Sequence, residues 1–300
     1  MKISIVILSH NVKTLLIQAI KSVYLTFKSK NIQIIVVDNA SSDGSVSSVK
    51  KEFPNVELVE SSINTGFSAG NNLARPYVKN EIVLFLNPDT VVQGDAIARC
   101  MQILLSNSNF GAITCKVMLS NGNIDYSCHR GLPTVWNTFC YWSGLSKLFS
   151  KSKLFSGYTA SYLSVNESHE IDCISGTFLM IRKNVLDKIG WWDEDYFWNG
   201  DDIELCYRIK KAGYKIWYEA SVQIIHHKGS SSGLQSTAKY NVEKEIRYKS
   251  AKSAAGAMRI FINKHSSELG PYHLMLLVKL GIYILEKYRI WKIDRGYKYA

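Results

Sequence analysis

The first ninety residues alternate between short apolar runs and segments with apolar residues at helical spacing. Ile3–Leu8, Ile32–Val37 and Ile82–Leu86 are nearly continuous apolar runs, as is typical of strands buried on both faces. Between the first two runs, Val12 to Phe27 place apolar residues on one face of a helix. Strands that alternate with helices predict an α/β fold whose parallel strands are joined by right-handed crossovers.

Shorter elements complete this pattern. Asn11 is a plausible N-cap for the first helix, and a short helix is expected to end at Phe53. A further strand is expected at Val56–Glu60, and the loop Asn64–Asn72 separates it from a helix that precedes the strand Ile82–Leu86.

Three of the predicted strands end in polar residues. Ser9-His10-Asn11 follows the first strand, Asp38-Asn39-Ala40 the second, and Asn87-Pro88-Asp89 the strand Ile82–Leu86. In parallel sheets, ligands bind beyond the carboxyl ends of the strands, which share one edge. The sequence therefore predicts a binding site at this edge.

Common phosphate-binding motifs do not identify the ligand. Neither the dinucleotide fingerprint Gly-x-Gly-x-x-Gly nor the P-loop Gly-Lys-Ser/Thr follows the first strand. Gly66 and Gly70 would let backbone approach a phosphate, or would simply form a turn and a helix start. Asp38 could accept hydrogen bonds from a base or ribose, or could cap the following turn.

A second acidic cluster is formed by Asp201-Asp202-Ile203-Glu204. It opens a predicted helix that ends at Gly213, a favourable residue just beyond a helix C-terminus. The buried stripe of this helix is expected to contain Ile203, Cys206, Ile209 and Ala212. Acids in a first turn interact well with the helix dipole, but three in four positions exceed what a cap needs. A carboxylate here could act as a general base.

Histidine and tryptophan residues flank these acids. His226 and His227 follow an apolar strand, where a histidine is either a hydrogen-bonded structural residue or a ligand. Trp191, Trp192 and Trp198 could stack on the rings of a bound acceptor or could pack in the core.

Composition fits a globular protein. The chain has 300 residues, and hydrophobic residues make up 46% of it, too many for a disordered chain. Its 6 cysteines contain no Cys-x-x-Cys pair, so we expect reduced thiols in a cytosolic protein. The N-terminal apolar run is too short for a signal peptide.

The positive charge is concentrated near the C-terminus. From Lys228 to Ala300 there are 14 Lys and Arg against 5 Asp and Glu, so this segment carries +9 of the total net charge of +11. Leu274–Leu285 is apolar but shorter than a membrane-spanning helix. The tail could lie on an anionic membrane, or could pack as a helix against the catalytic domain or against a second copy in a homodimer. No recognisable nucleic-acid-binding module accompanies the charge, so we expect no nucleic-acid partner.

Five motifs together resemble glycosyltransferase family 2, in particular the rhamnosyltransferase-like bacterial enzymes that build surface polysaccharides. They occur in the family's order and spacing between about Ile3 and Ser232: VDNASSDGS, NTGFSAGNN, LNPDT, SGTFLMIRKNVLDKIGWWDEDYF and GDDIELCYRIKKAGYKI. The resemblance implies a GT-A fold, with a Rossmann-like nucleotide-binding half and a mixed central sheet. It predicts a catalytic domain at 1–232 and a basic, mainly helical extension at 233–300.

The resemblance also implies roles for individual residues. Asp202 matches the catalytic base, with Asp201 and Glu204 as its supports. Asp89 matches the metal-binding acid, and His226, or else His227, completes the metal shell. The positions that match the donor pocket are Ser9, Asn11, Asp38, Asn64, Gly66, Asn71 and Asn87. Asn87 replaces the first acid of the family's Asp-x-Asp signature, which should weaken metal affinity.

These roles imply an inverting enzyme that depends on Mg²⁺ or Mn²⁺. It would move a sugar, plausibly L-rhamnose from dTDP-rhamnose, from a nucleotide-diphosphate donor to a lipid-linked or growing polysaccharide acceptor. The expected location is cytoplasmic, peripheral on the inner face of the membrane. The alternative is a catalytically silent nucleotide-sugar-binding scaffold of the same fold.

Overall fold

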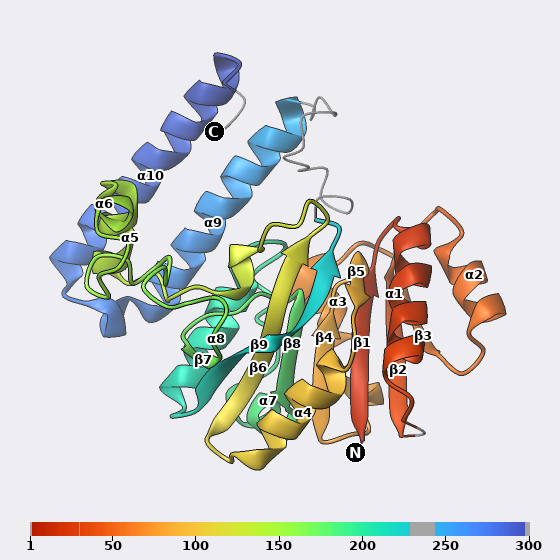
Figure 1. The fold of residues 1–300 in the computed structure, drawn as a ribbon. Coiled ribbons are helices and arrows are strands. Elements are labelled where there is room, and N and C mark those ends of the chain that lie inside the picture. Colours follow the sequence, from red (N-terminus) through yellow and green to blue (C-terminus); the bar gives the residue numbers. More distant parts are fainter. Residues whose placement is uncertain (1, 30, 229–243, 298–300) are drawn as a thin grey trace.

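The computed structural model describes residues 2–29, 31–228 and 244–297 (Figure 1). Its described part is built on a nine-stranded mixed sheet with the order β3-β2-β1-β4-β8-β6-β9-β5, and β7 pairs with β9. The strands are β1 (Ile3–Ser9), β2 (Ile32–Asn39), β3 (Glu57–Ser61), β4 (Ile82–Leu86), β5 (Thr90–Val92), β6 (Phe110–Leu119), β7 (His169–Ile171), β8 (Phe178–Arg182) and β9 (Lys215–His226).

Helices flank the sheet and extend the chain beyond it (Figure 1). The α-helices are α1 (Lys13–Thr26), α2 (Ser45–Glu52), α3 (Gly66–Asn72), α4 (Ala96–Ser106), α5 (Val135–Trp142), α6 (Leu145–Leu148), α7 (Lys183–Ile189), α8 (Asp201–Lys211), α9 (Lys244–Leu269) and α10 (Tyr272–Asp294). Two 3₁₀ turns lie at Arg75–Tyr77 and Tyr126–Cys128.

The first half of the sheet has the predicted parallel arrangement. β1 pairs in parallel with β2 and β4, and β2 pairs in parallel with β3. The register places Ser9 opposite Asp38, so the polar residues that follow these strands share one sheet edge as predicted. The predicted strand Ile82–Leu86 has the bounds of β4, and Val56–Glu60 is shifted by one residue from β3.

The second half of the sheet is mixed. β8 runs antiparallel to β4 and to β6, whereas β6 and β9 are parallel to each other. β5 pairs antiparallel with the end of β9. A purely parallel sheet therefore describes only the N-terminal half, and the mixed central sheet implied by the family resemblance is confirmed.

The predicted N-cap of the first helix is wrong by one residue. Val12 occupies the N-cap position of α1 and makes no side-chain capping bond. Asn11 has φ 54°, and its Oδ1 instead accepts a hydrogen bond from Ser42 N at 2.7 Å. Asn11 therefore joins the loop after β1 to the loop after β2, because an amide side chain satisfies the backbone of either loop equally well.

Among the described residues the C-terminal region is helical, as predicted, and packs on α8. α9 and α10 lie side by side (Figure 1) and share a small apolar cluster that includes Phe261 and Ile282, against which Ile203 of α8 packs. No helix in the described ranges is long and apolar enough to cross a membrane. The predicted domain boundary at 232/233 falls outside the described residues.

All six cysteines are buried, and none of them forms a disulfide bond.

Candidate active site

A cleft of about 620 Å³ opens at the carboxyl ends of the parallel strands. One wall comes from the loops that follow β1, β2 and β4, and the other from the N-terminus of α8 and the end of β9. Among the residues predicted from the sequence, those that line the cleft are Asn64, Gly66, Asn87, Trp198, Asp201, Asp202 and His226. The topology therefore brings Asn87 and the acids Asp201 and Asp202 to one cavity, whereas Asp89 is buried and does not line it.

Strand pairing places Asp89 beside His226. Asp89 directly precedes β5, whose Thr90 pairs with His226 on β9. As a result, His226 Nε2 lies 3.2 Å from Asp89 Oδ1, and both side chains are buried. On the opposite side of the ring, His226 Nδ1 lies 3.0 Å from Asp125 Oδ2. Lys228 Nζ also contacts Asp125, at 2.9 Å.

This arrangement favours a positive charge at His226. Burial alone would lower the pKa of His226, but its hydrogen bond with Asp125 and its proximity to Asp89 raise that pKa to about 9. The pKa of Asp125 is lowered well below its usual range, because His226 and Lys228 outweigh the effect of its burial. The pocket beside Asp89 is thus built to accommodate a cation.

The donor set fits a divalent metal. Asp89 Oδ1 is buried and, apart from its contact with His226 Nε2, has no hydrogen-bond partner among the described residues, so it has free capacity for a ligand. A carboxylate oxygen and an imidazole nitrogen, oriented by Asp125 behind it, are suitable ligands for Mn²⁺ or Mg²⁺. The described residues hold no group of three or more His, Cys, Asp or Glu arranged for a metal.

His227 is oriented differently from His226. Its backbone N–H donates to Asp89 O at 2.8 Å, and its Nδ1 lies 2.8 Å from Ser120 Oγ. Of the two histidines, the one whose ring contacts the Asp89 carboxylate is His226, the first choice made from the sequence.

Gly200 sets the start of α8 and hence the position of the acids. It has φ 84°, a left-handed conformation that favours glycine, and a Cβ there would lie 2.9 Å from Ala257 Cβ on α9. The helix begins directly afterwards with Asp201 and Asp202. Asp202 Oδ2 accepts a hydrogen bond from Arg130 Nη2 at 2.8 Å, which fixes the carboxylate in the cleft.

The two neighbouring acids have different environments. Asp201 is 6% exposed, and burial together with the negative charge of Asp202 raises the pKa of Asp201 well above its usual range. Asp202 is 18% exposed and is paired with Arg130. The environment favours a protonated Asp201, and Asp202 is the more exposed of the two, so Asp202 is the better placed proton acceptor.

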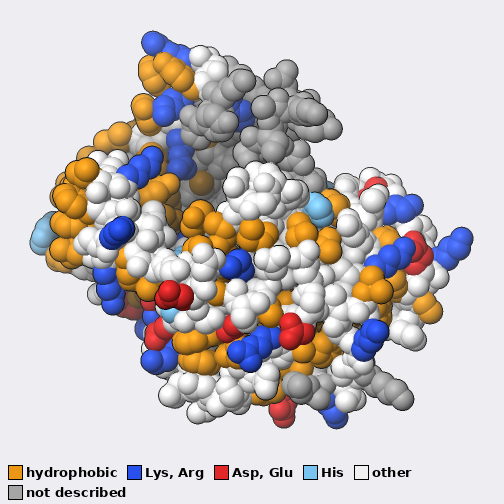
Figure 2. Space-filling view, viewed as in Figure 1, with side chains coloured by type: hydrophobic (Ala, Val, Ile, Leu, Met, Phe, Trp, Pro, Cys, Tyr) orange, Lys and Arg blue, Asp and Glu red, His pale blue; other side chains and the backbone are white. Residues whose placement is uncertain are grey.

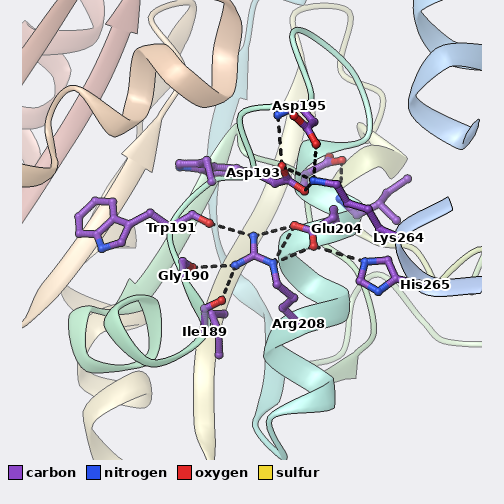
Figure 3. A network of polar contacts seen from close by, with 12 residues as sticks. Ile189, Gly190, Trp191, Asp193, Asp195, Glu204, Arg208, Lys264 and His265 are labelled. Carbon is purple, nitrogen blue, oxygen red and sulfur yellow. Dashed lines mark hydrogen bonds and ion pairs between the residues drawn. The ribbon is translucent and has the colours of Figure 1, made fainter. Parts of the chain in front are cut away.

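Glu204 lies on the buried side of α8 and interacts with Arg208 (Figure 3). Arg208 Nε donates to both oxygens of Glu204 at 2.8 Å, and Nη2 donates to Oε2 at 2.6 Å. The remaining guanidinium hydrogens bind backbone carbonyl groups of Ile189, Gly190 and Trp191. The pair therefore connects α8 to the segment after α7.

The same network includes α9 (Figure 3). His265 Nε2 lies 3.5 Å from Glu204 Oε1, and Lys264 Nζ contacts Asp193 and Asp195 at 2.6 Å each. These contacts attach the C-terminal region to the helix that carries Asp201 and Asp202.

Asn39 organises the opposite wall. Its Nδ2 donates to Asn64 Oδ1 and to Gly66 O, and its Oδ1 accepts from Thr65 N. Gly66 has φ 83°, and a Cβ there would lie 2.4 Å from Phe197 O. Only glycine allows this loop to approach the segment before α8 so closely, and the approach closes one end of the cleft.

The comparisons with known proteins agree with this geometry. A model of a family described as glycosyltransferase like family 2 matches residues 2–241, which is most of the chain. The chain belongs to glycosyltransferase family 2. It is accordingly an enzyme of the glycosyltransferase class, and the assignment made from the five sequence motifs is confirmed.

Two of the similar proteins are named as rhamnosyltransferases. N-acetylglucosaminyl-diphospho-decaprenol L-rhamnosyltransferase of Mycobacterium tuberculosis is 24% identical over 214 residues, covering 67% of this chain and 68% of the relative. Rhamnosyltransferase WbbL of Escherichia coli K12 is 23% identical over 256 residues, covering 81% of this chain and 91% of the relative.

Solved structures show the GT-A fold. The mannosyltransferase PcManGT from Pyrobaculum calidifontis, in complex with GDP-Man and Mn²⁺, has a TM-score of 0.54 and 16% identity, covering 99% of this chain and 84% of that one. GalNAc-T7 with UDP, GalNAc and Mn²⁺ has a TM-score of 0.58 and 17% identity, but this chain spans only 43% of it and aligns over 75% of its own length.

Several donor-pocket residues implied by the family resemblance do not line the cleft. Ser9, Asp38 and Asn71 are buried, whereas Asn11 is exposed at the loop that it joins. Asp38 Oδ2 caps the next turn by accepting from Ser41 N at 2.9 Å, which was one of the two roles considered for it. Its Oδ1 has no hydrogen-bond partner in the described part of the chain.

The tryptophans separate into two groups. Trp191 and Trp192 are buried, pack edge-on against Phe85, and do not line the cleft. They belong to the core, so an acceptor role does not fit their position. Trp198 lines the cleft beside Asp201 and Asp202.

The structure adds residues that no motif indicated. Arg130 and Asp125 come from the segment after β6, and Lys249 on α9 lines the cleft. Arg130 and Asp125 belong to none of the motifs, and their partners are 72 and 101 positions away in sequence. A local sequence pattern cannot reveal such contacts. His10 and Asn39 had a usable signal, since both lie in the predicted polar strand ends.

Proposed function

We propose that this glycosyltransferase is an inverting enzyme that transfers L-rhamnose from dTDP-rhamnose to a lipid-linked or growing polysaccharide acceptor. The observation that carries the proposal is that Asp202 and His226, which contacts Asp89, line one cleft. A base for the acceptor and a cation site for the leaving group are thus brought to one cavity. The choice of rhamnose is supported by the named activities of the two relatives.

The donor would lie along the wall formed by Asn39, Asn64 and Gly66. These residues present amide groups and close backbone, which suit a nucleotide and its phosphates. Asn87 and His226 lie further along the same cleft, so the diphosphate would extend towards Asp89. Lys228 and Lys249 add positive charge to the cleft walls, which favours an anionic donor.

Asp89 and His226 would hold a divalent ion, Mg²⁺ or Mn²⁺. When bound, such an ion stabilises the negative charge that grows on a leaving diphosphate. His226 Nε2 would have to lose its proton to act as a ligand, while Nδ1 keeps its contact with Asp125. Asn87 in place of a second acid makes the site less negative and would weaken metal binding.

Asp202 would act as the general base. The acceptor hydroxyl oxygen forms a bond to the anomeric carbon while the bond from that carbon to the donor diphosphate breaks, and the hydroxyl proton passes to Asp202. Both Asp202 oxygens already accept one hydrogen bond, from Arg130 and from Ile203 N. A carboxylate has further lone pairs, so it can also accept from the acceptor hydroxyl. Asp201 and Glu204 would position α8.

The expected surroundings are the cytoplasmic face of a membrane. Basic and aromatic side chains on α10 suit an anionic lipid surface. The alternatives are that α10 packs in a homodimer, or that the chain is a catalytically silent nucleotide-sugar-binding scaffold. Intact acids at Asp89, Asp202 and Glu204 count against a silent scaffold.

Thermal unfolding with a panel of nucleotide sugars, each with and without Mn²⁺, tests the donor. A ligand that binds the native state raises the protein's melting temperature. The rise grows with the ratio of the ligand concentration to the dissociation constant. We expect dTDP-rhamnose with Mn²⁺ to give the largest shift, followed by release of dTDP when an acceptor is added. A scaffold would give the shift without turnover.

A further inference from the structure

A second cavity, of about 560 Å³, opens next to the active-site cleft. Its walls come from α5, α9, α10 and the start of α8, and they are predominantly apolar. Met258 and Phe261 line it from α9, Leu277 and Ile282 from α10, and Phe139 from α5. Cavities of this size bind ligands rather than single waters. We call this cavity the apolar groove.

The apolar groove ends at the catalytic acids. Ser127, Trp198, Asp201 and Asp202 line both the groove and the active-site cleft. One molecule could therefore place a reactive group at Asp202 and a hydrocarbon portion among the helices. An apolar cavity that only stabilised the fold would have no reason to open beside the carboxyl groups of Asp201 and Asp202, whose polarity disfavours a dry neighbourhood.

The surface outside the groove is also apolar. Figure 2 shows hydrophobic side chains gathered over α5, α6 and α10, with Lys and Arg side chains among them. Leu277 is 64% exposed and Ile284 57% on α10, while Phe139 is 54% exposed on α5. A large exposed apolar patch on a protein marks a binding surface. The groove is thus continuous with an apolar exterior at one end and with the catalytic acids at the other.

The two ends of the apolar groove differ in charge. Arg130 lines the groove where it meets Asp202, and Lys249 lines the adjoining cleft from α9, the helix that forms one groove wall. Cations at this junction suit an anionic group that links a polar head to an apolar chain. A second copy of this chain would cover the outer patch but would not require a channel to the acids.

We propose that the apolar groove binds the hydrocarbon chain of the lipid that carries the acceptor sugar, with the phosphate linkage near Arg130 and the sugar at Asp202. The inference rests on the proposed function and deepens it, since it assigns a site to the lipid portion of the acceptor. α9 and α10 are then part of the acceptor site rather than a separate membrane anchor.

Gly281 provides a test that keeps the fold intact. It lies on α10 and lines the groove, and the nearest atom to an added Cβ is Trp142 Cζ3 at 3.8 Å. Gly281→Leu would fill the groove, while replacing a helix-destabilising glycine by a strong helix former. Gly256→Leu on α9 is the matched control, because a Cβ there meets nothing within 4 Å and the residue is outside the groove lining.

The experiment measures binding of farnesyl diphosphate and of inorganic diphosphate to the full chain by calorimetry. We expect farnesyl diphosphate to bind at least about tenfold tighter, since each methylene removed from water raises affinity roughly three- to fourfold. Gly281→Leu should remove that preference, leave the affinity for inorganic diphosphate unchanged, and melt at or above the wild-type temperature. Gly256→Leu should bind both ligands as the wild type does.

Equal affinity for the two ligands in the wild type, or an undiminished preference in Gly281→Leu, would overturn the proposal. The proposal would also be overturned if light scattering showed a dimer that binds no farnesyl diphosphate and that dissociates in Gly281→Leu. The apolar groove would then be the contact face between two copies of the chain. Sugar transfer is not needed for this readout. Farnesyl binding that Gly281→Leu abolishes supports the groove even if no donor is turned over, in which case the proposed function alone fails.

Discussion

Arg130 Nη2 lies 2.8 Å from Asp202 Oδ2, and this contact joins a segment after β6 to the first turn of α8. The two side chains are 20% and 18% exposed, so the ion pair is partly shielded from water. Burial alone would lower the pKa of Arg130, but the charge of Asp202 raises it above its usual range. Arg130 therefore stays charged and fixes the orientation of Asp202.

Asp89→Asn should weaken metal binding. The substitution keeps the side chain's shape but removes the negative charge beside His226. We expect the Mn²⁺ affinity of the complex with dTDP, measured by calorimetry, to fall at least about tenfold. Asp95→Asn, which alters an exposed acid a few residues later, should leave it unchanged. Equal Mn²⁺ affinity in Asp89→Asn and wild type would place the metal elsewhere.

Glu204→Gln should destabilise the fold. Glu204 is 2% exposed and forms the buried pair with Arg208, so the substitution leaves a buried guanidinium without its counter-charge. Removing one partner of such a pair costs about 3 kcal/mol or more. Thermal unfolding should show a melting temperature lower by several degrees.

The control is Glu52→Gln, which breaks the exposed pair with Lys21 and should cost less than about 1 kcal/mol. If Glu204→Gln and Glu52→Gln had the same melting temperature, the Glu204–Arg208 pair would not hold α8 in place.

His129 should make stability depend on pH. Its ring is buried against His169 and Tyr218, and burial with the neighbouring His169 lowers the pKa of His129 to about 4 from about 6.5. The unfolded chain therefore binds more protons than the folded chain between these values. Stability is complete above pH 6.5 and falls as the pH drops towards 4, by at most about 3 kcal/mol from this residue.

The check is the slope of unfolding free energy against pH between 6.5 and 4. His129→Gln cannot take up the proton and should flatten the slope, whatever its effect on absolute stability. His273→Gln, which changes an exposed histidine on α10, should keep the wild-type slope. A wild-type slope in His129→Gln would contradict the assignment.

The full chain should bind anionic vesicles at low salt. Each basic residue near an anionic surface contributes about 1 kcal/mol, and salt screens this attraction. Reversing the charge of exposed Lys279 and Lys287 on α10 should therefore cut co-sedimentation at least about tenfold. Reversing the charge of Lys21 and Lys50, which lie on α1 and α2, should leave co-sedimentation unchanged. Salt-independent binding, or none, would argue against membrane association through α10.

The N-terminal half of the sheet could be predicted because its signals are local. The apolar runs predicted the bounds of β1, β2 and β4 to within two residues. Parallel pairing of β1 with β2 then places Ser9 opposite Asp38. Asn11 was assigned wrongly as an N-cap, since an amide side chain can satisfy either a helix start or a neighbouring loop. Its contact with Ser42 depends on tertiary structure.

The candidate site could be predicted only in part. Asp202 and His226 carry motif signals, and the structure brings both to one cleft. Asp125 and Arg130 carry none, because their function depends on long-range pairing. The aromatic pair Trp191 and Trp192 looked like either core or acceptor site, and only burial against Phe85 distinguishes the two. The apolar groove was not predictable, since it exists only where α5, α9 and α10 meet.

The rate of sugar transfer by Asp202→Asn at saturating donor tests the central claim most directly. Asparagine keeps the shape and the contact with Arg130 but cannot accept the proton. The account predicts that the rate falls about 10²-fold or more while donor affinity stays within a few-fold of wild type. The rate of sugar transfer should fall less in Asp201→Asn, because Asp201 is buried next to Asp202 and is not the proposed base. A fully active Asp202→Asn, with Asp201→Asn inactive, would contradict the assignment of Asp202 as the base.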